Sequence, residues 1–191
     1  MLGSFHASRA QYFGCADLML RMIFSWEEGG YELKYTYFND EPAYLHGIRG
    51  GWYMDGEEKW VLGFSSYFAS TVINESFSLL NRQQLVTMYS TVYVDYTFFQ
   101  DKPVQLNPLL HLGYGFAELT DLGFGSTGSE YSGYYLVEPN INATIKVFRY
   151  MKFGLGLGYR AVGGVRMQGA DSYSLSGLSM NAFIKFGDFG D

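Results

Sequence analysis

The chain has 191 residues, the size of a single domain. Hydrophobic residues make up 48% of it, aromatic residues 19% and charged residues only 17%, a composition that excludes a disordered chain. The formal charge of −6, with 13 basic and 19 acidic residues, argues against the basic stripe of a nucleic-acid-binding protein. The single cysteine, Cys15, excludes an internal disulfide and a cysteine-based metal cluster. We expect neither a metal nor a cofactor.

Residues 1–28 are interpreted as a leader or a poorly determined segment. Their longest apolar stretch, Leu18–Trp26, is about half as long as a membrane-spanning helix and contains Arg21. The stretch also lacks a small-residue cleavage pattern, so it is not typical of a secretory signal. No transmembrane helix is therefore expected.

From Gly30 onward, apolar and polar residues alternate with a period of two, which predicts β-strands. Three predicted connections, at 55–58, 100–103 and 148–150, are short, and three others, at 73–83, 118–130 and 163–173, are long and polar or glycine-rich. The first outer loop, at 39–42, is the exception to this alternation because it is short. This alternation of short and long connections predicts an all-β fold, an eight-stranded antiparallel up-and-down transmembrane β-barrel at 29–187, with a C-terminal tail at 188–191. The eight expected strands are Gly30–Phe38, Ala43–Met54, Lys59–Val72, Gln84–Phe99, Val104–Phe116, Tyr134–Val147, Met151–Val162 and Leu175–Gly187.

The period of two does not by itself say which face of the sheet points inward. The interior of an eight-stranded barrel is just wide enough for side chains. One face carries many glycines, among them Gly47, Gly63 and Gly154, whereas the other is crowded with Phe, Tyr, Leu and Ile. We therefore expect the glycine-rich face inside and the bulky face toward lipid. The alternative, a soluble ligand carrier, would need many Lys and Glu residues on its outer face.

Aromatic residues near the strand ends have the outward parity expected of the two interfacial belts of a membrane barrel. They are Tyr37, Trp52, Trp60, Phe98, Tyr150 and Phe186. From Gly30 to Phe186 the chain thus resembles the small Gram-negative outer-membrane barrels of the OmpA/OmpX type. This resemblance implies a monomer in the bacterial outer membrane, surrounded by lipid and lipopolysaccharide. Its closing strand, Ser179–Phe186, is similar to the signal such proteins present to the barrel-assembly machinery, with Phe189 as the second candidate for the terminal aromatic.

Inward parity predicts a lumen that contains charges of both signs. These residues are Glu32, Lys34, Arg49, Asp95, His111, Glu138, Lys152, Arg160 and Lys185. Buried charges must be paired, and the hairpin registers predict two ion pairs, Glu32 with Arg49 and Glu138 with Arg160. The first requires Phe38 to pair with Ala43 across the first loop. A gated ion path and a plug both fit these charges, and the narrow lumen favours the plug.

One histidine raises the question of catalysis. His46 has outward parity, and Ser66 or Ser70 is expected within diagonal reach on the neighbouring strand. A lipid A deacylase would need such a lipid-facing pair, but we find no carboxylate to orient the imidazole and no His-x-Ser signature. We expect a structural or surface-interaction role with three long extracellular loops. The alternatives are a deacylase-like enzyme that modifies lipid A and a narrow channel.

Overall fold

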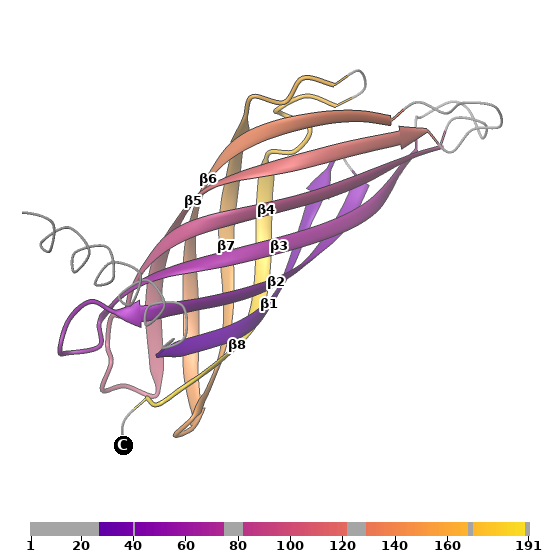
Figure 1. Cartoon of the computed structure of the whole chain (residues 1–191). Coiled ribbons are helices and arrows are strands. Elements are labelled where there is room, and N and C mark those ends of the chain that lie inside the picture. Colours follow the sequence, from indigo (N-terminus) through magenta and orange to yellow (C-terminus); the bar gives the residue numbers. More distant parts are fainter. Residues whose placement is uncertain (1–26, 40, 75–81, 122–128, 168–169, 190–191) are drawn as a thin grey trace, which may run out of the picture.

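The computed structural model describes residues 27–39, 41–74, 82–121, 129–167 and 170–189. The described residues form eight antiparallel strands that close into one barrel, each strand pairing with its sequence neighbours and β1 pairing with β8 (Figure 1). Their bounds are β1 Glu28–Phe38, β2 Glu41–Tyr53, β3 Trp60–Asn74, β4 Arg82–Tyr96, β5 Val104–Asp121, β6 Ser129–Phe148, β7 Met151–Gly163 and β8 Gly177–Gly187. The predicted eight-stranded up-and-down barrel is confirmed. Residues 1–26 of the expected leader lie outside the described residues.

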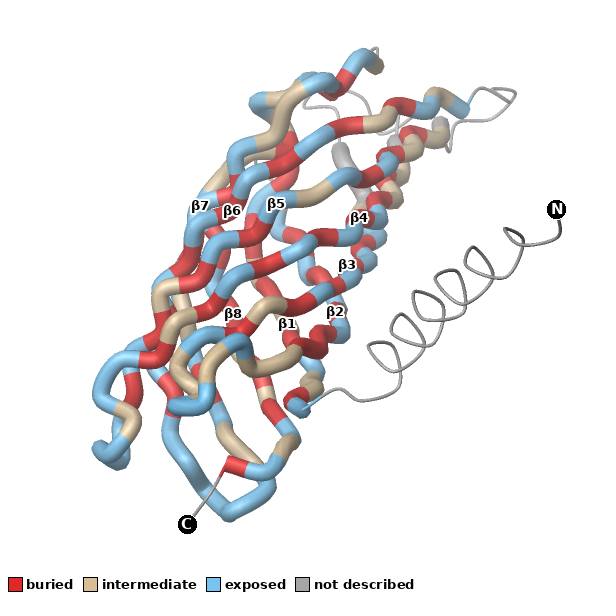
Figure 2. Tube along the Cα trace, turned by 60° about the vertical axis from the view of Figure 1, so that its left-hand side comes forward, coloured by how far each residue is buried: buried red, intermediate tan, exposed pale blue. Residues whose placement is uncertain are grey.

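Buried and exposed residues alternate along the strands, as Figure 2 shows for most of the wall. On β6, for example, Glu138, Asn140 and Asn142 are buried while Val137 and Ile141 are exposed. The exposed face of the barrel is therefore its apolar face, and the interior is polar. Within the described residues, no helix has the length and apolar character needed to cross a bilayer.

The barrel has two unlike ends. The short-turn end carries the connections 54–59, 97–103 and 149–150 together with both ends of the described chain, whereas the loop end carries the other connections. Four neighbouring strands, β3 to β6, have 15, 15, 18 and 20 residues, compared with 11 to 13 in the other four. The strands predicted from the sequence ended where the apolar face ends, so Glu118–Asp121 and Ser129–Glu130 were expected in a loop. Those residues in fact continue the ladder, with Thr120 opposite Ser129.

The register of the first hairpin differs from the prediction by two residues. Phe38 pairs with Glu41, and Ala43 lies opposite Thr36. The connection is therefore only residues 39–40, and Asn39 adopts a left-handed φ of 48°, which asparagine tolerates better than most residues. A tight turn of this length matches the twist of the two strands.

Glycines on the inner face lie directly opposite aromatic residues. Gly47 pairs with Tyr67 across β2 and β3, and Gly63 pairs with Tyr93 across β3 and β4. Both tyrosines are almost fully buried, and a Cβ added at either glycine would collide with the opposite ring. The glycines thus make room for large side chains that lie flat over the neighbouring strand. The expectation that small residues mark the inner face holds, but the interior also contains large rings.

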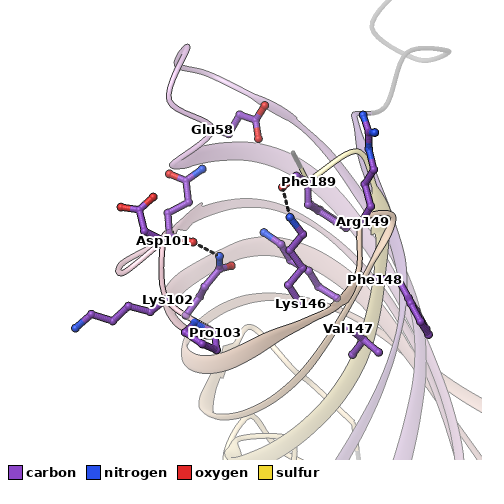
Figure 3. A pocket seen from close by; sticks show the side chains of 12 residues that line it. Glu58, Asp101, Lys102, Pro103, Lys146, Val147, Phe148, Arg149 and Phe189 are labelled. Carbon is purple, nitrogen blue, oxygen red and sulfur yellow. Dashed lines mark hydrogen bonds between the residues drawn. The ribbon is translucent and has the colours of Figure 1, made fainter. Parts of the chain in front are cut away.

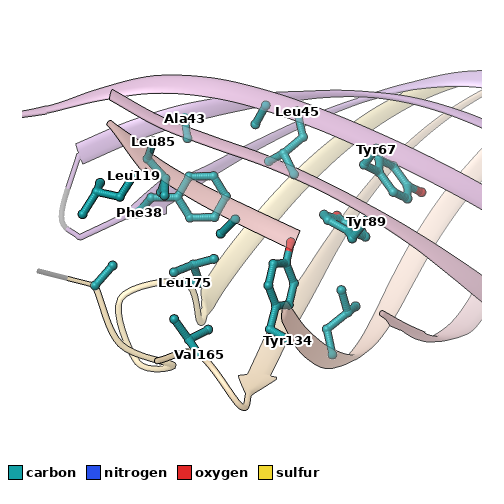
Figure 4. Packing of buried hydrophobic residues seen from close by; sticks show 14 residues of the cluster. Phe38, Ala43, Leu45, Tyr67, Leu85, Tyr89, Leu119, Tyr134, Val165 and Leu175 are labelled. Carbon is teal, nitrogen blue, oxygen red and sulfur yellow. The ribbon is translucent and has the colours of Figure 1, made fainter. Parts of the chain in front are cut away.

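The loop end of the interior is filled by an apolar cluster. Phe38, Leu45, Leu85 and Leu136 project into it from four strands, and Leu175 joins it from the segment that connects β7 with β8 (Figure 4). That segment is attached to the wall by hydrogen bonds, for the Arg160 Nε atom donates to the Leu175 carbonyl at 2.9 Å. The cluster closes off the barrel interior at this end, because its members are almost inaccessible to solvent.

The segment connecting β7 with β8 depends on one exposed carboxylate, which gives a pH prediction. Asp171 Oδ1 accepts hydrogen bonds from the backbone N–H and the hydroxyl of Ser174, both at 2.8 Å, and these bonds lower the pKa of Asp171. A lowered folded-state pKa contributes stability above the ordinary aspartate pKa, and this contribution is lost as pH falls through the folded-state value. We expect the amide NMR signal of Ser174 to move toward its random-coil position below pH ~4, and Asp171→Ala to show that position already at pH 7. A Ser174 signal that is independent of pH would contradict this prediction.

Candidate functional site

The barrel interior contains a chain of buried ion pairs whose members alternate in sign. At its centre, Glu32 on β1 accepts hydrogen bonds from Arg49 Nη1 at 3.4 Å and from the Tyr67 hydroxyl at 3.0 Å. Its other oxygen accepts from Asn181 Nδ2 at 3.1 Å and lies 3.7 Å from Lys34 Nζ. All of these side chains are buried, so the Glu32 carboxylate exchanges its hydration for four protein partners.

The chain of ion pairs continues in both directions from Glu32. Toward the short-turn end, Arg49 Nη2 lies 3.1 Å from Asp95 Oδ2, which accepts from Lys185 Nζ at 2.8 Å. Lys185 Nζ in turn lies 3.1 Å from Glu28 Oε1. In the other direction, Lys34 Nζ donates to Glu138 Oε1 across the lumen at 2.9 Å. The complete series is Glu138, Lys34, Glu32, Arg49, Asp95, Lys185 and Glu28, contributed by β1, β2, β4, β6 and β8.

The two ion pairs expected from hairpin register have different outcomes. Glu32 and Arg49 do form an ion pair, but in a diagonal arrangement, because the register shift places Gly47 opposite Glu32. The predicted pairing of Glu138 with Arg160 is wrong. Glu138 bonds to Lys34 and to the Ser179 hydroxyl, and Arg160 bonds to Thr36 and the Leu175 carbonyl. Closure of the barrel brings Lys34 of β1 to the Glu138 carboxylate, and Arg160 on the adjacent strand β7 is not its partner. The register of a single hairpin does not show this contact.

The remaining predicted lumen residues lie at two levels. His111 is fully buried near the middle, where its Nδ1 atom lies 2.9 Å from the Thr91 hydroxyl and its ring contacts Tyr93 in a tilted arrangement. Lys152 lies at the short-turn end and is only partly buried, with its Nζ atom 4.3 Å above the centre of the Phe189 ring. The predicted set is therefore brought together only in part, since His111, Lys152 and Arg160 do not join the chain of ion pairs.

Three members of this network were not found from the sequence. Glu28 was left outside the first strand because two glycines follow it, although it shares the even-numbered parity of Glu32 and Lys34. Tyr67 and Asn181 both donate to Glu32. Tyr67 was missed because large aromatic residues were assigned to the lipid-facing side. The signal available in the sequence was Gly47, which lies opposite Tyr67.

The lipid-facing histidine does not form the pair with serine that catalysis would need. His46 is exposed on β2, and its Nδ1 atom lies 2.5 Å from the Tyr31 hydroxyl. Ser66 bonds to the Ser90 hydroxyl at 2.7 Å, and Ser70 accepts from Gln84 Nε2 at 3.0 Å. In the described part of the chain, neither serine hydrogen-bonds to His46, so the arrangement offers no activated nucleophile.

The predicted belt residues lie on the outer face. Tyr37, near the loop end, is 50% exposed and stacks edge-on with Tyr35. Near the short-turn end, the Trp60 ring lies 4.6 Å from Tyr96, which contacts Phe98 in turn. Tyr150 and Phe186 are also exposed, whereas Trp52 is only partly so. This placement suits rings at the two borders of a hydrocarbon layer.

At the short-turn end, the interior opens into a pocket of about 650 Å³ (Figure 3). Its lining includes four cationic and two anionic side chains, contributed by the turns and by the ends of β6 and β7: Lys102, Lys146, Arg149, Lys152, Glu58 and Asp101. Phe189, which follows β8, turns inward and is 8% exposed. Over the described ranges, no group of three or more His, Cys, Asp or Glu residues could hold a metal ion.

The sequence matches no protein-family model, and no curated protein matches it significantly. Solved structures with a similar fold do exist. Neisserial surface protein A is 10% identical, with a TM-score of 0.59 over 83% of this chain and 94% of that one. A major outer membrane protein of Thermus thermophilus is 10% identical (TM-score 0.58; 83% and 98% covered). Ail, the attachment invasion locus protein of Yersinia pestis, is 13% identical (TM-score 0.51; 83% and 93% covered).

These similarities show the fold of small outer-membrane barrels. The outer surface of this chain supports the same placement independently, because its exposed strand residues are mostly Leu, Ile, Val, Met and aromatic residues. Such a surface is stable in hydrocarbon, where every backbone polar group must be paired within the closed sheet. The chain therefore has the eight-stranded fold of the small outer-membrane β-barrels, with an outer surface suited to hydrocarbon.

Proposed function

We propose that the protein is a non-conducting barrel whose loop end forms an interaction surface outside the cell. The observation that carries the proposal is the filled interior: the buried chain of ion pairs around Glu32 occupies the middle of the lumen, and the apolar cluster around Phe38 and Leu175 occupies its loop end. An eight-stranded barrel has little interior space beyond that of its own side chains. With the middle and the loop end of the lumen filled, the outer surface of the loop end is the part available for contacts outside the cell.

The lengths of the strands support the position of this interaction surface. Outer-membrane barrels place their short turns in the periplasm and their loop end outside the cell. At the loop end, β6 pairs with β5 from Ser129 onward, but its pairing with β7 begins only at Tyr135. Likewise, the pairing of β3 with β2 ends at Ala69, whereas its pairing with β4 continues to Asn74. A four-stranded sheet, β3 to β6, thus extends past the closed barrel (Figure 1).

The extended sheet has a polar outer surface. Tyr131 is 70% exposed, and its hydroxyl donates to Glu118 Oε1 at 2.7 Å. The Thr120 hydroxyl lies 3.4 Å from the same oxygen. Side chains held in this way on a rigid sheet are suited to recognition, because few of their conformations are lost on binding. Two structural neighbours, Neisserial surface protein A and the attachment invasion locus protein Ail, have names that agree with such a role. Because the sequence identities of these neighbours are low, they support only the fold. The interaction surface is inferred from the geometry of this chain.

The remaining partners follow from the outer face. Outer-membrane lipid and lipopolysaccharide would surround the exposed band, and the isolated barrel would be a monomer. The barrel-assembly machinery would recognise β8 during biogenesis through its outward terminal aromatic. Phe186 supports this role, since it is 54% exposed on the outer face, whereas Phe189 is buried at the mouth of the pocket.

The proposal can be tested by changing the extended sheet and leaving the barrel intact. Gram-negative cells that display the protein are applied to immobilised glycoproteins and polysaccharides, and retained cells are counted. Glu118→Lys combined with Tyr131→Ala should abolish retention, and Lys102→Ala at the opposite end should leave it unchanged. Heat-modifiable gel migration verifies that each variant is folded. Equal retention of the double variant and the unmodified protein, or no retention above cells without the barrel, would refute the proposed role.

A further inference from the structure

A row of like charges lies at the short-turn end, and two of its members, Lys146 and Lys152, line the pocket. Lys146, Lys152 and Lys185 lie directly opposite one another on β6, β7 and β8. Like charges in this arrangement destabilise a sheet unless each is compensated. Lys185 is compensated by Asp95 and Glu28, and Lys146 donates to the Phe189 carbonyl at 3.2 Å. Lys152, between these two lysines, is the third member of the row, and its Nζ atom lies over the Phe189 ring.

Lys152 is a cation without a carboxylate partner. Among the residues that the structure describes, no Asp or Glu oxygen lies within 4 Å of its Nζ atom, and its recorded contact is with the face of the Phe189 ring at 4.3 Å. Cationic side chains outnumber anionic ones by four to two in the pocket lining, although the whole chain carries a net charge of −6. The pocket is therefore a local concentration of positive charge in an acidic protein.

A second, independent observation also points to a ligand. Gln105 lines the same pocket from β5 and is only 4% exposed. Its Nε2 atom donates to the Gln100 carbonyl at 2.8 Å, which fixes the orientation of the amide, and its Oε1 atom is buried without a hydrogen-bond partner. An unpaired buried acceptor of this kind costs about 1–3 kcal/mol, a cost that an N–H donor in the pocket would remove.

We propose that this pocket binds a small ligand carrying a carboxylate beside N–H donors, as the free end of a peptide does. The carboxylate is held by Lys152, and a backbone N–H of the ligand donates to Gln105 Oε1. The pocket volume of about 650 Å³ lies within the range of small-molecule sites. Because the short turns of such barrels face the periplasm, the ligand comes from that compartment. A bare oxyanion would neutralise Lys152 without supplying the N–H donors that Gln105 lacks.

The test uses the full chain, refolded in detergent micelles and observed by NMR. N-acetyl-alanyl-alanine should produce saturable shifts in the amide signals of Lys152 and Gln105. Its C-terminal amide should bind about tenfold more weakly, the factor expected for loss of one charge-assisted hydrogen bond. Inorganic phosphate should bind more weakly than the dipeptide, and added salt should weaken the binding of both.

Three variants make the proposal falsifiable. Lys152→Met and Gln105→Leu should each weaken dipeptide binding by about tenfold. Arg166→Met removes the same charge from an exposed position at the loop end and should leave the affinity within about twofold. Lys152→Met removes an uncompensated charge, so the fold should be retained. Three results would overturn the assignment: no binding to the unmodified protein, equal affinity for the acid and its amide, or phosphate binding as tight as that of the dipeptide with no effect of Gln105→Leu.

Discussion

Replacing Arg49 with leucine should lower the free energy of unfolding by about 3–5 kcal/mol, the range found when one partner of a buried ion pair is removed. Arg49 is the only residue of the described chain that joins Glu32 to Asp95, at 3.4 and 3.1 Å. Its guanidinium also lies 4.5 Å above the Tyr93 ring. The substitution leaves two carboxylates with reduced compensation in the barrel interior. Urea unfolding of the refolded barrel in detergent, followed by tryptophan fluorescence, measures the loss.

Two further variants separate the loss of charge from a general effect of substitution. Arg166→Leu removes an exposed arginine at the loop end and should change the unfolding free energy by less than about 0.5 kcal/mol. Asp95→Asn in the Arg49→Leu background removes a carboxylate that has lost one of its two cationic partners, Lys185 being the other, and should recover part of the stability. If Arg49→Leu unfolds at the same urea concentration as the unmodified protein, the chain of ion pairs does not stabilise the barrel.

The second large effect is expected at Gly47. A methyl group at this position would collide with the Tyr67 ring on the neighbouring strand, and overpacking of this kind costs about 1–3 kcal/mol. Gly177→Ala provides the matched control, because the nearest atom to its added Cβ is 3.9 Å away. Denaturant unfolding of both variants should show a loss for Gly47→Ala only.

A double-mutant cycle tests whether the collision with Tyr67 is the cause. In a Tyr67→Ala background the ring is absent, so Gly47→Ala should have little further effect on the unfolding free energy. Additive losses from the two substitutions would show that Gly47 is required for another reason. The cycle thus tests directly the pairing of inward glycines with inward aromatic rings.

Local alternation and loop lengths were sufficient to predict the number of strands and their order. The face that contacts lipid was predicted from the distribution of glycines and bulky residues over the two faces, which is also visible in sequence. The extent of β5 and β6 was underestimated because polar residues such as Thr120 and Ser129 continue the ladder beyond the apolar band. The strand ends were therefore predicted where the lipid contact ends and not where backbone pairing ends.

The interior was harder to predict than the wall. Parity identified Glu138 and Lys34 as inward residues, but their ion pair joins β6 to β1, which are not neighbours in the sheet. Which side chains meet across the lumen depends on the tilt and closure of the whole barrel, and no single hairpin contains that information. Glu28 shows the same limitation, because its partner Lys185 becomes adjacent only when β8 closes on β1.

Single-channel recording in planar lipid bilayers shows whether the barrel interior is closed to ions. The refolded protein is inserted, and its insertion is verified by protease protection and heat-modifiable migration. Because ion pairs fill the middle of the lumen and the apolar cluster fills its loop end, we expect a baseline current without discrete steps at any applied voltage. Reproducible single-channel steps from the inserted protein would contradict it.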